Sequence, residues 1–187
     1  MTKLIYITHP SVELDRNKLP HQWGLSEKGF EQTKLLIEKP FWHEVNVIYS
    51  SAEPKATQVA NLASDKYHLP WFIEKDLGEA DRTTTPFLQP DEYMDEVQKA
   101  YLHPDMNIRG WESHHQMMKR NAAVLEKIKN DNPEKTIVIV GHGGAGTTVK
   151  CTIKGIEPSF DEDPKQTGCI FIADLDTNTI IQDWVRY

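Results

Sequence analysis

The sequence is poor in cysteine and contains no long hydrophobic run. Its two cysteines, Cys151 and Cys169, match no metal-ligand spacing, so we expect two reduced thiols in a reducing compartment. No segment approaches the ~20 apolar residues that a membrane span requires. The apolar start of the chain turns polar at Thr8 and His9, too early for the core of a signal peptide. A cytoplasmic protein without a membrane partner is therefore predicted.

Positive charge is also scarce. The chain has 21 Lys and Arg against 28 Asp and Glu, a formal net charge of −7. Non-specific nucleic-acid binding needs a basic face that displaces counterions, so no nucleic-acid partner is expected. Apolar material is plentiful, at 39% hydrophobic residues, which excludes an intrinsically disordered chain. A length of 187 residues favours a single domain, residues 1–187.

Six apolar runs bounded by polar residues predict strands. They lie at about Lys3–Thr8, Val45–Ser50, Trp71–Glu74, Thr136–Gly141, Cys169–Asp174 and Thr179–Val185. The runs at 45–50 and 136–141 are nearly continuous, as expected for strands buried on both faces of a parallel sheet. The predicted fold is α/β, a three-layer sandwich with a mainly parallel central sheet of about six strands and helices on both faces. A hairpin between the last two strands allows one antiparallel strand.

Helical periodicity lies between these strands. Helices are predicted from the N-cap Ser26 to about Glu38, over Lys55–Lys66, from the capping-box residue Ser113 to about Lys129, and from Gly144 to near Gly155. Phe30, Leu35 and Ile37 are the apolar residues of the first. The segment Asp81–Trp111 is irregular apart from a short amphipathic helix near Asp91–Tyr101. It is too long for a plain connection, and we interpret it as an active-site cover.

Two histidines follow predicted strands. His9 comes after the first strand, and His142 comes after the strand at 136–141, followed by two glycines and a helix. A single histidine is more often structural, but ligands bind beyond the carboxyl ends of parallel strands. A helix N-terminus there also favours an anion. Lys55 and Glu79 follow two other strands, so two imidazoles, a cation and a carboxylate can converge, a set that fits phosphoryl transfer through a histidine nucleophile.

The motifs around these residues resemble those of the histidine phosphatase superfamily, also called phosphoglycerate mutase-like. The similar segments are Leu4–His9 with Gly24–Gly29, Ile48–Ala60, Leu77–Glu79, Gly110–Ser113 with Arg120, and Val138–Gly144, in family order along nearly the whole chain. The resemblance implies a phosphatase that hydrolyses a small phosphomonoester and needs neither metal nor cofactor.

The resemblance also implies residue roles. His9 would attack phosphorus through one ring nitrogen while a backbone carbonyl holds the other N–H. Glu79 would protonate the leaving alkoxide and later deprotonate water. His142, with backbone N–H groups such as that of Gly143, would donate to the phosphoryl oxygens.

Two arginines of the family pattern are absent. The first motif reads Thr8-His9-Pro10 where the family has arginine, histidine and glycine, and Lys55 stands where the second motif has arginine. Thr8 would offer the phosphate a neutral hydroxyl and Lys55 a point charge, whereas arginine offers a rigid fork. Arg82, three residues after Glu79, is the candidate replacement, although a surface salt bridge to Asp81 or Glu79 would explain it equally well.

Other functions fit parts of the same pattern. A phospholigand-binding protein without catalysis would share every site residue, and the missing arginines favour it. The turn Gly141–Gly146 matches the dinucleotide-binding fingerprint, yet only about forty residues follow it, too few for the further strands and helices of such a domain. Adjacent His114 and His115 point about 100° apart on a helix and chelate a metal poorly.

Overall fold

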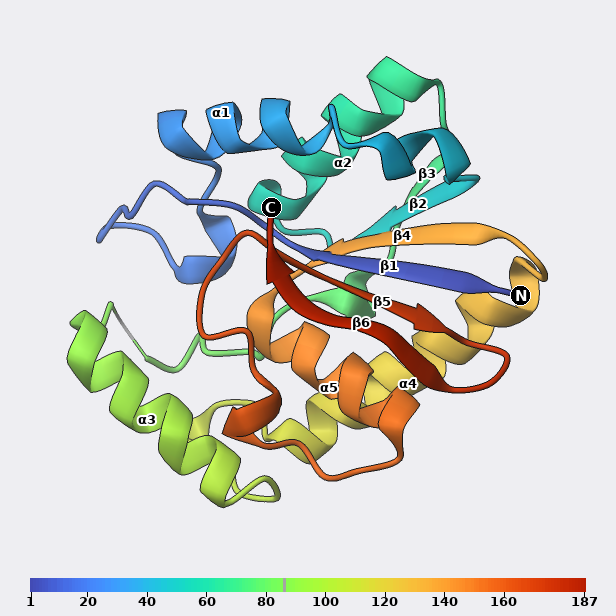
Figure 1. Ribbon diagram of the computed structural model, residues 1–187. Coiled ribbons are helices and arrows are strands. Elements are labelled where there is room, and N and C mark those ends of the chain that lie inside the picture. Colours follow the sequence, from blue (N-terminus) through green and yellow to red (C-terminus); the bar gives the residue numbers. More distant parts are fainter. Residues whose placement is uncertain (86) are drawn as a thin grey trace.

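A single six-stranded sheet forms the centre of the molecule, with strand order β3-β2-β4-β1-β5-β6 (Figure 1). The structure, a computed structural model, describes residues 1–85 and 87–187. Its strands are β1 Lys3–Thr8, β2 Val47–Ser50, β3 Trp71–Ile73, β4 Thr136–Gly141, β5 Cys169–Asp174 and β6 Thr179–Arg186. β5 alone runs against its neighbours β1 and β6, and the other pairs are parallel. The predicted, mainly parallel sheet is confirmed.

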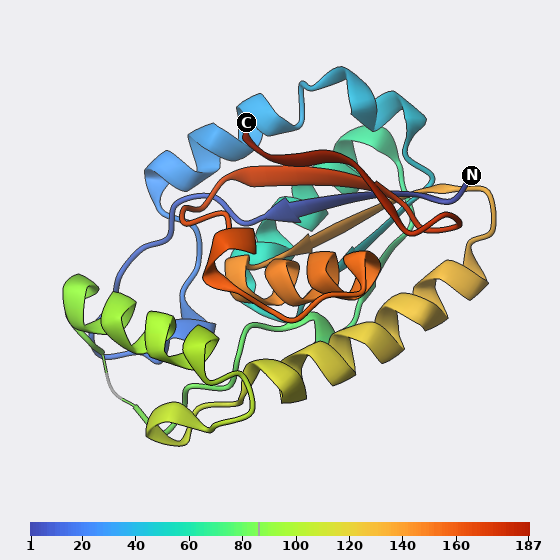
Figure 2. The same ribbon diagram turned by 60° about the horizontal axis from the view of Figure 1, so that its bottom comes forward.

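Helices cover both faces of this sheet. They are α1 Glu27–Leu36, α2 Pro54–Tyr67, α3 Pro90–Leu102, α4 His114–Asp131 and α5 Gly143–Lys154. α1 and α2 lie on one face and α4 and α5 on the other, while α3 stands beside the layers (Figures 1 and 2). Leu4 and Tyr6 of β1 belong to one core, and Ile5 and Ile7 belong to the other. Successive strand residues point to opposite faces, so both must be apolar.

Local signals place the helix starts correctly. Ser26 caps α1 by accepting from the Gly29 N–H at 3.1 Å. Ser113 and Gln116 form the predicted capping box at α4. Not every apolar residue of this segment is buried, because Leu35 is 70% exposed while Leu36 is fully buried. The buried stripe runs through Gly29, Thr33 and Leu36, spaced four and three residues apart along one face of the helix.

The carboxyl ends of β1, β2 and β4 meet at one edge of the sheet. The ladder continues one residue beyond the strands, because the His9 N–H donates to Gly141 O at 2.9 Å and the Ser51 N–H donates to Val140 O at 3.1 Å. These bonds fix the backbone on which His9, Ser51 and His142 stand.

The structure also bears on the possibility of a membrane span and on the two cysteines. No helix among the described residues is long and apolar enough to cross a membrane. Cys151 and Cys169 are free and buried.

Candidate active site

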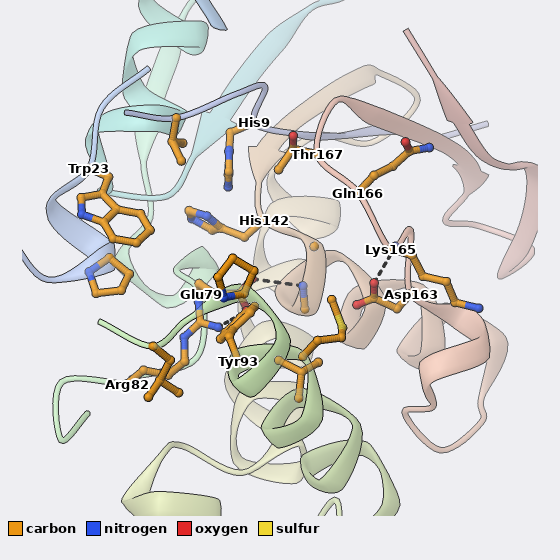
Figure 3. Close-up of a pocket in the computed structure, with 18 of the residues that line it drawn as sticks. His9, Trp23, Glu79, Arg82, Tyr93, His142, Asp163, Lys165, Gln166 and Thr167 are labelled. Atoms are coloured by element: carbon orange, nitrogen blue, oxygen red, sulfur yellow. Dashed lines mark hydrogen bonds between the residues drawn. The ribbon is translucent and has the colours of Figure 1, made fainter. Parts of the chain in front are cut away.

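A cavity of about 360 Å³ lies at this edge of the sheet. Six of the residues predicted to form the site line it, namely His9, Lys55, Glu79, Arg82, His142 and Gly143. Figure 3 shows His9, Glu79, Arg82 and His142 among them. The ring centroids of His9 and His142 are 5.3 Å apart. Side chains far apart in the sequence therefore converge around one space, as the strand-end argument predicts.

His9 is held as a neutral imidazole with one free nitrogen. Its Nδ1 lies 2.8 Å from the Pro10 carbonyl oxygen, which can only accept, so Nδ1 carries the proton. Burial, reinforced by the positive charge of Lys55, lowers the pKa of His9 to about 4. The lone pair on Nε2 is consequently available at neutral pH, which is the form a nucleophile needs.

His142 has one bonded and one unbonded ring nitrogen. Nε2 lies 2.8 Å from Ser51 Oγ and 3.2 Å from Glu53 Oε1. Nδ1 is buried and has no partner among the described residues. Burial and the neighbouring His9 and Lys55 hold the pKa of His142 well below its ordinary value. Because buried polar atoms are normally paired, the open Nδ1 beside the cavity is suited to a ligand atom.

Glu53 joins three of the site residues and was not identified from the sequence. Its Oε1 accepts from the Glu79 N–H at 2.8 Å and lies close to His142 Nε2. Its Oε2 forms an ion pair with Lys55, whose ammonium also donates to Pro20 O at 2.8 Å. The sequence signal is its position three residues after β2 and two residues before Lys55, inside the motif at 48–60. The charge of Lys55 is thus already balanced inside the protein.

The carboxylate of Glu79 sits on the N-terminus of α5. Oε2 accepts from the Gly144 N–H at 3.1 Å, and Oε1 accepts from the Ala145 N–H at 3.1 Å and the Ala80 N–H at 3.0 Å. A Cβ on Gly144 would lie 2.7 Å from Oε1, so this approach requires glycine. Burial by itself would raise the pKa of Glu79, but the Arg82 charge, His142 and a backbone N–H bond outweigh it and leave the pKa lowered. The anion predicted at this helix start is the chain's own carboxylate.

Arg82 is a half-buried cation in the cavity wall. Its guanidinium donates to the Tyr93 hydroxyl and lies 4.9 Å from the Tyr93 ring and 5.6 Å from the Trp111 ring. Trp111 is itself anchored by its Nε1–H, which donates to Thr85 Oγ1 at 2.7 Å. No carboxylate of the described chain pairs with Arg82, so the alternative of a surface salt bridge is wrong. Residues of the segment 81–111 hold this cation at the site.

Thr8 does not face the cavity. Its hydroxyl accepts from the Cys169 N–H at 2.8 Å and lies 3.3 Å from the Cys169 carbonyl oxygen. The prediction that Thr8 would contact the phosphate is corrected accordingly, because pairing between β1 and β5 engages its side chain.

The loop carrying Glu79 is fastened by an ion pair. Arg120 Nε and Nη2 each lie 2.7 Å from a Glu112 carboxylate oxygen. Nη2 also donates to the Glu79 carbonyl oxygen at 3.2 Å. This bidentate pair holds the backbone from which Glu79 projects.

The structure argues against the two other readings of the sequence. A Cβ on Gly141 would lie 2.2 Å from the Tyr6 hydroxyl, and Gly144 faces Glu79. The glycines of the 141–146 turn therefore make room for the protein's own side chains, not for a pyrophosphate. His115 pairs with Glu157 at 2.6 Å and His114 stacks on Tyr101. The described residues hold no group of three metal-ligating side chains.

Comparisons with known proteins show which family and which proteins this chain resembles. The family model "Histidine phosphatase superfamily (branch 1)" matches residues 11–181. Phosphoserine phosphatase 1 of Hydrogenobacter thermophilus is 24% identical over 169 residues, which cover 85% of this chain and 79% of that protein.

Two solved structures share the fold. Phosphoserine phosphatase of Entamoeba histolytica in complex with 3-phosphoglyceric acid has a TM-score of 0.77 and 21% identity, covering 97% of this chain and 95% of that one. A putative alpha-ribazole-5'-P phosphatase of Escherichia coli has a TM-score of 0.79 and 17% identity, covering 100% and 98%.

Proposed function

Because the chain belongs to the histidine phosphatase superfamily, branch 1, we propose that it is a phosphatase that hydrolyses a small phosphomonoester through a phosphohistidine on His9. The observation that carries the proposal is the pairing of His9 Nδ1 with the Pro10 carbonyl, which leaves Nε2 unprotonated in a cavity shared with Glu79 and His142.

The first step transfers the phosphoryl group to the protein. The lone pair on His9 Nε2 attacks phosphorus as the ester P–O bond breaks, and the leaving oxygen takes a proton from Glu79. The phosphate dianion favours a second proton on His142, so that Nε2 donates toward Ser51 and Glu53 while Nδ1, the open ring nitrogen, donates to a phosphoryl oxygen. The phosphate also lies near the cavity-lining Arg82.

Glu79 must gain a proton before this step. In the unliganded protein its lowered pKa keeps it ionised. A phosphate dianion beside the carboxylate repels that charge and raises the pKa of Glu79, so Glu79 takes up a proton from the solvent as the substrate binds. In the second step Glu79, ionised again, takes a proton from water. The water oxygen attacks phosphorus, the N–P bond breaks, and its electron pair returns to His9 Nε2.

The cover segment and the cations define the substrate end of the site. We assign residues 81–111 as the cover, because Arg82, Tyr93 and Trp111 all line the cavity. Arg82 supplies the guanidinium that the first two motifs lack, and Lys55 contributes through its field at His9. Loss of one preorganised donor costs about 10²–10³ in rate, so turnover is expected to depend strongly on Arg82.

Further observations bear on the substrate class, the compartment and nucleic-acid binding. The relatives' names include phosphoserine, 3-phosphoglyceric acid and alpha-ribazole-5'-P, which supports a small phosphorylated molecule as the substrate. The free thiols Cys151 and Cys169 support a reducing compartment, the cytoplasm. The net charge of −7 is unfavourable for nucleic acid.

A phospholigand-binding protein without turnover is the second candidate. It is favoured by the internal ion pair of Lys55 with Glu53 and by the Thr8 hydroxyl bonded to Cys169, which leave few free donors for a phosphate. This candidate keeps the same cavity but predicts saturable binding with no product.

The test is a panel of phosphomonoesters assayed with the wild type, His9→Ala and the control His103→Ala, which alters an exposed histidine. An alkaline quench preserves phosphohistidine, which is labile in acid. We expect a trapped phosphoenzyme and turnover in the wild type and the control, and neither in His9→Ala. Undiminished turnover in His9→Ala would refute the mechanism, and saturable binding without turnover in the wild type would establish the binding protein.

A further inference from the structure

The larger part of the cavity wall is apolar. Beyond His9 and His142 the wall is formed by side chains from separate segments, including Leu14, Trp23, Phe87, Met94, Val97 and Phe160. They come from the loop after β1, the segment 81–111 with its helix α3, and the loop before β5. Because several elements contribute to this wall, it forms only in the tertiary structure, and no single sequence motif encodes it.

Two of these segments meet over the cavity. The rings of Trp23 and Phe87 have centroids 6.2 Å apart. The Trp23 Nε1–H donates to Asp15 O at 2.9 Å, so the polar edge of the indole is already bonded. Trp23 lies beside the cavity in Figure 3. What it offers a ligand is therefore an apolar ring, and Phe87 extends that surface.

With one exception, each charged group of the wall either has a partner of opposite charge or backbone N–H partners inside the protein or is assigned to the phosphate. Lys55 pairs with Glu53, Glu79 is held by three N–H groups, and Arg82, which donates to the Tyr93 hydroxyl, is the cation assigned to the phosphate. The carboxylate of Asp163 accepts from the Tyr101 hydroxyl and the Lys165 N–H, both at 2.7 Å. The exception is the exposed Lys165 side chain, whose ammonium lies 4.9 Å from the Phe160 ring.

This distribution of apolar and charged groups indicates the chemical class of the alcohol that leaves the substrate. An ester that also carries a carboxylate and an ammonium, such as phosphoserine, would lose the hydration of both charges on binding. The cavity wall would replace few of the lost hydrogen bonds. An apolar alcohol would instead replace water along Trp23, Met94 and Val97. We propose that the substrate is the phosphomonoester of an apolar alcohol. This proposal rests on the proposed phosphatase function and specifies its substrate class.

The magnitude follows from burial of methylene groups. One buried methylene is worth a factor of about four in binding at 25 °C. Straight-chain alkyl phosphates isolate this effect, because their alcohols have nearly the same acidity and the chemical step stays constant. From ethyl to hexyl phosphate four methylenes are added, so complete burial gives a ceiling of about 250-fold in kcat/KM.

The experiment measures kcat/KM for ethyl, butyl and hexyl phosphate, with phosphoserine as the charged competitor. We expect a rise of tenfold or more from ethyl to hexyl, and butyl phosphate ahead of phosphoserine. A smaller rise overturns the proposal. A preference for phosphoserine over butyl phosphate also overturns it, and would indicate that Lys165 binds the substrate carboxylate.

Two variants on α3 test whether the alkyl chain binds in this cavity. Met94→Gln keeps the side-chain length but places an amide in the wall, and Leu102→Gln makes the same kind of change at a residue that is 75% exposed on the same helix. Met94→Gln is expected to lower the hexyl-to-ethyl ratio at least threefold, and Leu102→Gln to leave it unchanged. Equal ratios in both variants would show that the alkyl chain does not bind in this cavity.

Binding separates this proposal from the phosphatase function. If no ester is hydrolysed, the phosphatase function fails, and calorimetric titration with ethylphosphonate and hexylphosphonate, which are not hydrolysed, still decides the character of the site. Hexylphosphonate binding at least tenfold more tightly supports an apolar site, and a smaller difference overturns it.

Discussion

Acid should destabilise this protein through His9. The pKa of His9 is about 4 in the folded state against an ordinary value of 6.5, chiefly because burial disfavours the imidazolium and Lys55 repels it. The unfolded chain therefore binds this proton first as the pH falls. A histidine with a lowered folded-state pKa contributes stability that is fully present above about pH 6.5. That contribution is lost as the pH falls toward 4.

The size of the effect follows from the gap between the two pKa values, 6.5 − 4 = 2.5 pH units. At about 1.4 kcal/mol per pH unit the whole contribution is roughly 3–4 kcal/mol. Between pH 7.5 and 4.5 most of it is lost, so His9 alone should lower the free energy of unfolding by about 2–3 kcal/mol.

Urea denaturation at pH 7.5 and 4.5 measures this loss. The wild type is compared with His9→Gln and with His103→Gln, which changes an exposed histidine. His142, whose pKa is also lowered, contributes in the same direction, and because His9 is one of the causes of that shift, His9→Gln also reduces the His142 contribution. His9→Gln should therefore lose at least about 2–3 kcal/mol less than the wild type between the two pH values. An equal loss in His9→Gln and the wild type would refute the burial argument.

Three further predictions concern the site and the core. Glu79→Gln removes the proton donor and should lower kcat/KM for alkyl phosphates by about 10²–10⁴. The loss should be much smaller for nitrophenyl phosphate, whose leaving group needs no proton, and equal losses would contradict the acid role. Arg120→Lys breaks the fork with Glu112 and loosens the Glu79 loop. A hydrogen bond to a charged group is worth about 1.5–3 kcal/mol, so kcat should fall about tenfold or more, with KM nearly constant in steady-state assays. Leu77→Ala empties a fully buried position and should cost about 2–5 kcal/mol in urea denaturation, whereas Leu35→Ala, at an exposed position, should change stability by less than about 0.5 kcal/mol.

The sequence was sufficient to predict the sheet, because strand and helix periodicities are local. The runs at 3–8 and 136–141 are strands with the predicted bounds, and Ser26 and Ser113 cap helices where expected. The convergence of His9, Lys55, Glu79 and His142 was also predictable, since the carboxyl ends of parallel strands share one edge. Leu35 shows the limit of this approach, because the buried stripe of a short helix depends on how the helix is rotated against the sheet.

Only the tertiary structure decided which partner each side chain has. Thr8 bonds to Cys169 and Glu79 to the first N–H groups of α5, contacts between segments distant in the sequence, and Arg82 bonds to Tyr93 within the irregular segment 81–111. The apolar wall of the cavity is likewise assembled from several segments. Residue types and their order specify elements through local backbone preferences, whereas contacts of this kind depend on the angles and offsets at which whole elements pack. Those angles and offsets come from the global packing of the core, and no short stretch of sequence encodes them.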